Sequence, residues 1–184
     1  MDPDEKQEIL DSIKRHTDRL GQILVLLHDL VSSAKASPAD VAIPDLLESV
    51  VSELDREDTV LDVQVVAPEI SVLGRKKYLQ VALLFILKNA RDALIGNPFG
   101  RIHIDVTTDN ESVFVDIRDN GVGMTDAELT RCIQPGFSSK PPGEGSGLGL
   151  SAAYSIIASH GGRLTLQSEK GKGTTCRVEL PSKK

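Results

Sequence analysis

Aromatic side chains are scarce in this sequence. It has no tryptophan, two tyrosines and four phenylalanines among 184 residues. The core must therefore be aliphatic, and few rings are available to stack on nucleic-acid bases. The net charge of −6 also argues against binding to a phosphate backbone, so we expect no nucleic-acid partner.

Long apolar runs and clustered cysteines are missing as well. The longest apolar run, Val81–Leu87, is far shorter than the roughly 20 residues that span a bilayer. The acidic start, Met1 to Glu5, lacks the basic region of a signal peptide. Cys132 and Cys176 stand far apart, without the spacing of a metal or redox motif. We expect a cytoplasmic chain without membrane contact of its own, although a longer parent protein could be membrane-anchored.

The first 37 residues predict one long amphipathic helix. Apolar residues recur there in alternating steps of four and three, which is a heptad pattern. A second apolar column widens the stripe to the face that a four-helix bundle needs. Residues 3–35 therefore predict a homodimer, and Ser32–Pro38 predicts the linker to a second domain, residues 38–184. The stripe consists of Ile9, Ile13, Leu20, Ile23, Leu27, Leu30 and Ala34.

Residues 38–184 predict a mixed domain of helices and strands. Helices are expected at Pro44–Leu54, Arg75–Ile95, Thr125–Cys132 and Gly147–His160. Strands are expected at Val41–Ile43, Val60–Val66, Ser71–Leu73, Arg101–Thr107, Ser112–Arg118, Arg163–Ser168 and Thr174–Leu180. The successive hairpins predict a largely antiparallel sheet with helices on one side. The expected fold is α+β, a two-layer α/β sandwich preceded by the long helix.

Asp119 directly follows an expected strand and opens the run Asp119-Asn120-Gly121-Val122-Gly123. A short carboxylate at a strand end can accept a hydrogen bond from an exocyclic amine, and the glycines would let the backbone close over a flat ring. A tight turn with an Asx cap accounts for the same residues structurally. On these residues alone both interpretations stay open.

A second glycine-rich run, Gly145-Ser146-Gly147-Leu148-Gly149, precedes an expected helix. Glycines at a helix N-terminus expose N–H groups at the positive end of the dipole, where phosphate binds. The run is not a dinucleotide fingerprint, because no strand leads directly into it, nor a P-loop, because no Gly-Lys-Ser/Thr follows. Taken alone, it could equally be an ordinary flexible loop.

Asn89 lies within the apolar helix expected at Arg75–Ile95. An amide in such a helix needs a partner, and its oxygen is a suitable hard ligand for Mg²⁺. A satisfied core amide is the structural alternative. The order of the three motifs, with the elements between them, would bring them around one cleft. Together they favour a site for ATP with Mg²⁺.

These motifs resemble the N, G1, G2 and final glycine boxes of the Bergerat ATP-binding fold. Gyrase, MutL, the ninety-kilodalton heat-shock chaperone and sensor histidine kinases share that fold. The segment Phe137-Ser138-Ser139-Lys140, with His160-Gly161-Gly162, is similar to the nitrogen-regulation-type branch of the histidine kinases. The resemblance covers roughly residues 41–181. The four boxes are Asn89–Ala93, Asp119–Gly123, Gly145–Gly149 and Gly171–Thr174.

The resemblance implies a role for each box. Asn89 would bind Mg²⁺, Asp119 the adenine amine, and Thr174 would lie near the adenine by way of water. Residues 134–146 would form a lid over ATP, and Lys140 would approach the terminal phosphate as a catalytic residue alongside Asn89. The implied nucleotide-binding set is Asn89, Asp119, Gly121, Gly123, Lys140, Gly145, Ser146, Gly147, Leu148, Gly149 and Thr174.

The N-terminal helix resembles the second helix of the dimerisation-and-phosphotransfer hairpin of these kinases. We find no counterpart of the first helix, which carries the phosphorylated histidine. The run His28–Ser33 imitates that phosphoacceptor box but lacks its proline, so we interpret His28 and His16 as bundle residues. The expected reaction passes the γ-phosphoryl of ATP to a histidine on a helix outside this chain, and then to the receiver domain of a response regulator. The chain alone is expected not to autophosphorylate.

Phe85 departs from the family pattern. It stands one helical turn before Asn89, where gyrase-like ATPases have a Glu base and histidine kinases usually an Asn. Phe cannot accept a proton, so hydrolysis on the gyrase plan is not expected. Phosphoryl transfer rests mainly on positioning and charge stabilisation, so a kinase remains the main hypothesis. The alternatives are a degenerate nucleotide-binding dimerisation module or phosphotransfer regulator, and an anti-sigma-type serine kinase, a group that has a Glu at this position.

Overall fold

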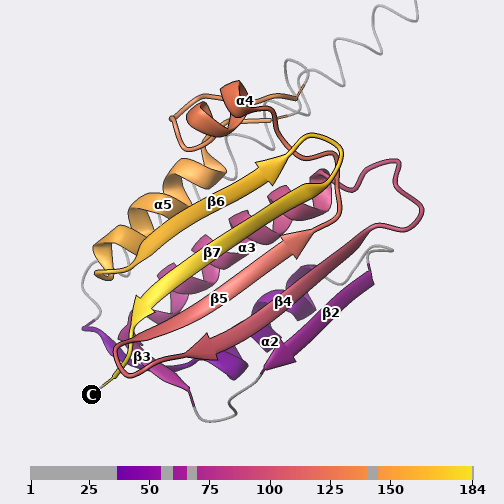
Figure 1. The fold of residues 1–184 in the computed structure, drawn as a ribbon. Coiled ribbons are helices and arrows are strands. Elements are labelled where there is room, and N and C mark those ends of the chain that lie inside the picture. The colour runs from indigo at the N-terminus through magenta and orange to yellow at the C-terminus, as the bar shows by residue number, and fades with distance from the viewer. Residues whose placement is uncertain (1–36, 55–59, 66–69, 141–144, 184) are drawn as a thin grey trace, which may run out of the picture.

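A computed structural model of the chain describes residues 37–54, 60–65, 70–140 and 145–183 (Figure 1). The helix expected over residues 1–37, and the homodimer that it predicts, lie outside these residues apart from position 37. Within the described part of the chain, no helix is long and apolar enough to cross a membrane.

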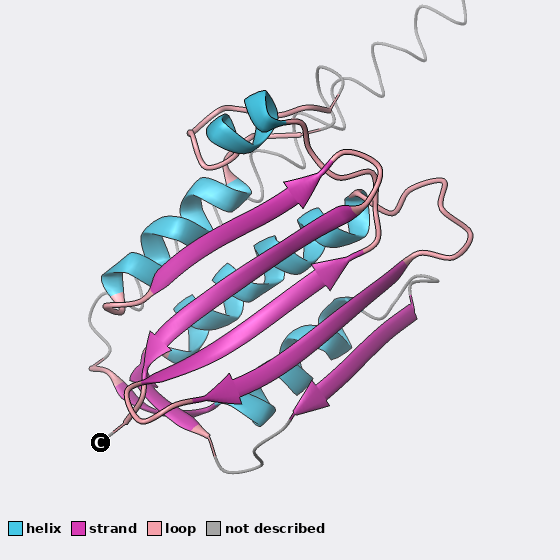
Figure 2. Ribbon diagram, viewed as in Figure 1, coloured by secondary structure: helices cyan, strands magenta, loops and turns pink. Residues whose placement is uncertain are grey.

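A five-stranded sheet forms one layer, and helices α2, α3 and α5 cover one of its faces (Figures 1 and 2). The strand order is β2-β4-β5-β7-β6, and all neighbours are antiparallel except β2 and β4. The sheet comprises β2 (Val60–Val65), β4 (Arg101–Thr108), β5 (Ser112–Asp119), β6 (Arg163–Glu169) and β7 (Gly173–Pro181). The helices are α2 (Ile43–Leu54), α3 (Lys76–Asp92), α4 (Asp126–Arg131) and α5 (Gly149–Ser159). A separate antiparallel pair, β1 (Ala39–Ala42) and β3 (Ser71–Gly74), lies at the N-terminal end of α3.

The core lies between the sheet and the helices and is aliphatic, as the shortage of aromatic residues predicts. Alternate residues of β4, β5 and β7 are buried toward the helices, because side chains alternate along an extended backbone. The expected apolar face of α3 is buried, and the two-layer sandwich predicted from the hairpin pattern is confirmed. The largest fully buried side chains include Ile43, Leu46, Leu47, Leu79, Leu87, Ile102, Ile104, Ile117 and Ile157.

Two helix boundaries differ from the expected ones for reasons that bear on the site. α3 ends at Asp92 rather than Ile95, and the carbonyl of Ala93 just beyond it accepts a hydrogen bond from Val122 N–H at 3.0 Å. α5 begins at Gly149 rather than Gly147, because Gly147 has a φ of 64°, which a right-handed helix cannot contain. By contrast, α4 begins within one residue of its expected start, because Thr125 caps it in a complete capping box.

An ion pair between an exposed arginine and a buried aspartate joins β5 and β7 on the uncovered face of the sheet. The guanidinium of Arg177 on β7 donates to both carboxylate oxygens of Asp116 on β5, at 2.6 and 2.7 Å. Asp116 is only 4% exposed. The hydrogen bonds from Arg177 hold the pKa of Asp116 below its usual value, against the opposing effect of burial. This pair joins the two strands that lead into the site.

Candidate functional site

The three sequence motifs converge at one end of the sheet. Asp119 ends β5 and lies opposite Thr174 at the start of β7. The hydrogen bond from Val122 to Ala93 ties the turn after β5 to the end of α3. The start of α5 packs on α3, where a Cβ placed on Gly149 would lie 3.0 Å from a ring carbon of Phe85. The predicted convergence around one region therefore holds.

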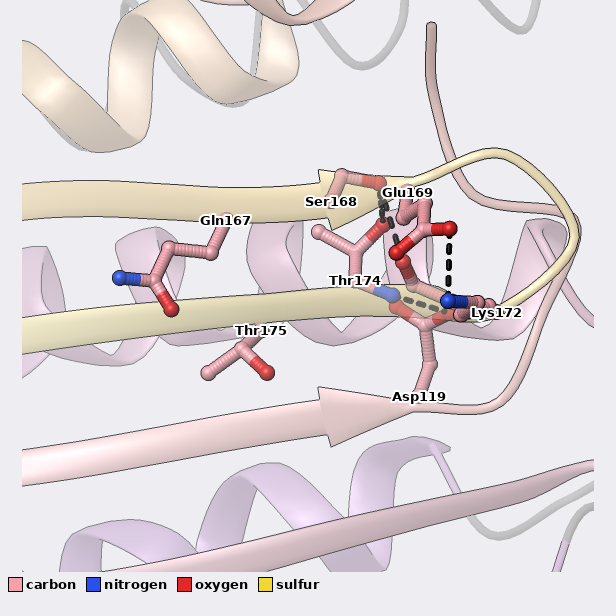
Figure 3. A pocket seen from close by; sticks show the side chains of 8 residues that line it. Asp119, Gln167, Ser168, Glu169, Lys172, Thr174 and Thr175 are labelled. Atoms are coloured by element: carbon pink, nitrogen blue, oxygen red, sulfur yellow. Dashed lines mark hydrogen bonds and ion pairs between the residues drawn. The ribbon is translucent and has the colours of Figure 1, made fainter.

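Asp119 has one bonded and one available carboxylate oxygen. Its Oδ1 accepts the N–H group of Gly121 at 2.9 Å. It also accepts the N–H group of Thr174 at 3.3 Å (Figure 3). The first of these bonds is an Asx turn, so the structural interpretation of this motif is correct as far as it goes. Within the described part of the chain Oδ2 makes no hydrogen bond, and no buried side-chain polar atom there lacks a partner. Oδ2 is therefore accessible to a ligand.

Burial controls the charge of this carboxyl group. It raises the pKa of Asp119, and the N–H groups of Gly121 and Thr174 oppose that shift only in part. Among the described residues this half-buried carboxylate has no cationic partner, so it gains most from a hydrogen-bond donor on its open oxygen. Asp119 can therefore accept a hydrogen bond from an amine placed at the end of β5.

Ser168 at the end of β6 is a site residue that sequence reasoning missed. Its hydroxyl accepts Met124 N–H at 2.8 Å, donates to the Gly173 carbonyl at 3.0 Å, and lies 2.9 Å from the hydroxyl of Thr174. Ser168 thus fixes the side chain of Thr174 next to Asp119 (Figure 3). Its role depends on the register of β6 and β7, which no local sequence pattern reveals. An open depression of about 330 Å³ lies here, lined by Asp119, Gln167, Ser168, Glu169, Lys172, Gly173, Thr174 and Thr175.

The glycines after Asp119 have a packing role in the protein, and their expected role of closing over a flat ring stays a prediction. A Cβ on Gly121 would lie 2.4 Å from the carbonyl oxygen of Ala93. A Cβ on Gly123, whose φ is 59°, would lie 2.0 Å from the carbonyl oxygen of Glu169. The turn is wedged between the end of α3 and the β6–β7 connection, where only glycine fits. This wedge holds Asp119 rigidly at the edge of the site.

The Gly145–Gly149 loop is packed, which argues against an ordinary flexible loop. Gly147 accepts a hydrogen bond from Gly136 N–H at 2.9 Å, and a Cβ on Gly147 would lie 2.5 Å from the carbonyl carbon of Gly136. α5 then starts after Leu148 without a side-chain cap. The first N–H groups of a helix have no partner inside it, so they can bind an anion. Ser146 Oγ accepts Leu148 N–H at 3.2 Å, which shapes the approach to this helix start.

Asn89 is exposed on α3 and makes no hydrogen bond through its side chain within the described residues. The alternative of a satisfied core amide is therefore wrong. Within the described ranges no cluster of three acidic, histidine or cysteine residues could hold a metal alone. One amide oxygen, completed by phosphate oxygens and water, is the ligand set that Mg²⁺ accepts when it arrives with a nucleotide. The residues present thus fit a metal carried by a phosphate ligand.

Lys140 reaches the same helix. Its ammonium forms an ion pair with Asp92, which lies three residues after Asn89 on α3. The structure therefore brings Lys140 near Asn89, and contact of either residue with a phosphate or metal stays a prediction. Residues 141–144 of the expected lid lie outside the described residues.

Phe85 fills the space between α3 and α5. It is half-buried at the edge of the core, and its ring meets the backbone of Gly149. No carboxylate or amide thus stands one turn before Asn89, which is the position of the general base in gyrase-like ATPases.

A model of the histidine kinase-, DNA gyrase B-, and HSP90-like ATPase family matches residues 74–184, which include every one of these motifs. The chain belongs to this family. Its similarity to sensor histidine kinases, predicted from the boxes, is confirmed. It is 35% identical over 115 residues to sporulation kinase B of Bacillus subtilis, a match that covers 62% of this chain and 26% of that protein. It is also 29% identical over 174 residues to the sensor protein TdiS of Thauera aromatica, covering 90% of this chain and 31% of TdiS.

Solved structures confirm the fold of this family member. The mycobacterial sensor histidine kinase MprB shares 25% identity at a TM-score of 0.69, over 79% of this chain and 98% of that one. Full-length ShkA, solved in complex with AMPPNP, has the same TM-score at 22% identity, over 88% of this chain and 36% of that one. This chain thus spans about a third or less of the kinases TdiS and sporulation kinase B.

Proposed function

We propose that this chain is the catalytic, ATP-binding domain of a two-component sensor histidine kinase. The observation that carries this proposal is the half-buried Asp119, whose Oδ2 is open, at the same end of the sheet as the uncapped start of α5. Asp119 can accept a hydrogen bond from an amine, and the start of α5 can bind an anion. ATP carries both groups. Membership of the ATPase family supports the same conclusion.

The residues present can divide the work of binding ATP. Asp119 accepts the adenine amine, and Thr174 holds a water beside the ring. The N–H groups at the start of α5, after Leu148, receive the phosphates. The ammonium of Lys140 meets the terminal phosphate, and Asn89 supplies an amide oxygen for the metal. Magnesium, when bound, neutralises phosphate charge and aligns the terminal phosphoryl group.

The acceptor of that group is a histidine on a helix outside this chain. Its imidazole nitrogen attacks the γ-phosphorus, the bond to the bridging oxygen breaks, and ADP leaves. A receiver-domain aspartate of a response regulator then takes the phosphoryl group from the histidine. Phe85 supplies no base, so this domain contributes binding, orientation and charge stabilisation. Pairing of residues 3–35 with a second copy would bring the acceptor helix within reach, on the cytoplasmic side if the parent protein is membrane-anchored.

A second candidate is a nucleotide-dependent interaction module without catalysis. The packing of Phe85 against Gly149 favours it, because an apolar ring stands where the resemblance to histidine kinases implies an Asn. This module would bind ATP and change its association with a partner, without consuming the nucleotide.

Calorimetry with Mg·ATP, followed by a mixing assay, separates these functions. We expect the chain to bind ATP, to remain unlabelled when incubated alone with γ-labelled ATP, and to label an added acceptor hairpin on histidine. Failure to bind ATP would refute the proposal. Binding without transfer to any cognate hairpin would favour the interaction module, and acid-stable label on a partner serine would favour a serine kinase.

A further inference from the structure

The ion pair between Lys140 and Asp92 joins segments that lie 48 residues apart in the sequence. Asp92 is the last residue of α3, and Lys140 belongs to the segment that follows α4. Asp92 stands three residues after Asn89, and residues at that spacing share one face of a helix. The pair therefore fixes the lysine over the helix face that carries the proposed metal ligand.

The remainder of the lysine is held by its own segment. Its backbone N–H donates to Ser138 Oγ at 3.2 Å. A Cβ on Gly145 would lie 2.5 Å from Ser138 Oγ and 3.3 Å from Cδ of Lys140. The lysine stem thus runs along the glycine loop, and its ammonium ends at Asp92. Side-chain exposures of 33% for Lys140 and 26% for Asp92 place the pair at the border of the site rather than in open solvent.

Charge explains why a carboxylate is tolerated here. An unpaired Asp92 one turn from Asn89 would repel a triphosphate. Arg91 Nε also lies near Asp92, at 3.9 Å, and Lys140 is the closer of these two cations. An ammonium group has three N–H donors, and the bond to Asp92 leaves two for phosphate oxygens. The pair is therefore compatible with a bound nucleotide.

We propose that Asp92 is a positioning residue, which holds the ammonium of Lys140 beside Asn89 before ATP arrives. This inference rests on the proposed function, because it assumes that the ATP phosphates lie near Asn89 and the start of α5. A lysine ordered in advance loses less rotamer freedom when the ligand binds. Affinity therefore increases for ligands that carry the group which the lysine contacts. That place is the terminal phosphate, which ADP lacks.

The experiment compares Mg·ATP and Mg·ADP affinities by calorimetry on the full chain. The variants are Asp92→Asn, Asp92→Glu, Lys140→Met and the double variant Asp92→Asn/Lys140→Met. The control is Glu53→Gln, which removes an exposed acid on α2. We expect Asp92→Asn to weaken ATP binding about tenfold, which corresponds to the rotamer freedom of one lysine side chain, while ADP affinity changes less than about threefold. Asp92→Glu should retain most of the preference for ATP, because its carboxylate can still pair with the lysine.

The double variant tests whether the two residues act as a unit. It should bind ATP no more weakly than Lys140→Met, because Asp92 acts only through the lysine and its lone charge repels phosphate. Tighter ATP binding by Asp92→Asn would overturn the inference, since it would mean that Asp92 competes for the lysine. The inference would also be overturned if Asp92→Asn lost the same affinity for ATP as for ADP, so that the ratio of the two Kd values stayed unchanged. A wild-type chain that binds neither nucleotide would instead overturn the proposed function, and this inference with it.

Discussion

Replacing Asp119 with asparagine separates the stability of the site from its function. The amide oxygen of an asparagine can accept the N–H groups of Gly121 and Thr174, as Oδ1 of Asp119 does at 2.9 and 3.3 Å. Flipping the amide would set its NH₂ group against both donors, so these two bonds fix its orientation. The NH₂ group must then occupy the position of Oδ2, which opens to the ligand.

The folded protein is expected to be at least as stable after this change at neutral pH. Burial raises the pKa of Asp119, which means that its ionised form is less favourable in the folded chain than in the unfolded one. The ionised carboxylate is therefore destabilising above both pKa values, and this contribution fades as the pH falls and the group takes up its proton. The difference in folding stability between variant and wild type should accordingly shrink when the pH is lowered to about 4. Thermal unfolding at both pH values measures it.

Nucleotide binding should change in the opposite direction. The adenine amine, a donor, would face the NH₂ group of asparagine, another donor. Loss of a hydrogen bond to a charged group weakens binding by about 1.5–3 kcal/mol, or roughly 10- to 150-fold in Kd. Calorimetry with Mg·ATP measures the loss, and Asp126→Asn, on the exposed start of α4, is the matched control. An ATP affinity within about threefold of wild type, or lower stability at neutral pH, would refute this account of Asp119.

Three further predictions concern the glycine turn, the Asp116 ion pair and the contact of Phe85 with Gly149. Gly123→Ala should lower the unfolding free energy by about 2–4 kcal/mol in urea titrations, because the turn has no room for a Cβ. The control Gly136→Ala, also at positive φ but in open space, should lower it by about 1 kcal/mol. Equal effects of the two substitutions would contradict this account of the turn. Asp116→Asn should lower it by about 1–3 kcal/mol at neutral pH. The lowered pKa of Asp116 makes its contribution present above the unfolded value and lost as the pH falls, so the effect should vanish in acid; a pH-independent effect would exclude the ion pair as its cause. Gly149→Ala should weaken ATP binding, and Phe85→Leu should restore part of it in the double variant, because the new methyl group meets the ring; absence of rescue would contradict that contact.

Local pattern was sufficient to predict most of the fold. The period of apolar residues placed every described helix and strand to within a few residues, because burial of one face imposes a period of two on strands and near 3.6 on helices. Turn residues set the hairpins, and Thr125 set the start of α4. The motifs of Asn89, Asp119 and Gly145–Gly149 predicted a site through their combination and order, since each motif alone also fits a structural role.

Tertiary packing decided what these residues are free to do. Asn89 stands in a largely apolar helix, yet only the arrangement of α3 against the sheet shows that its amide faces outward. The sequence of the turn does not show what its glycines pack against, and only the structure places the carbonyl oxygens of Ala93 and Glu169 beside Gly121 and Gly123. Ser168 acquires its role from strand register alone.

The sequence by itself determined the elements, the apolar core and the chemistry available for ATP, because those follow from neighbouring residues. Only the tertiary structure decided the pairing of Lys140 with Asp92, the contact of Phe85 with Gly149 and the open oxygen of Asp119. These depend on how segments distant in sequence pack, and the direction in which a side chain points is set by the whole core.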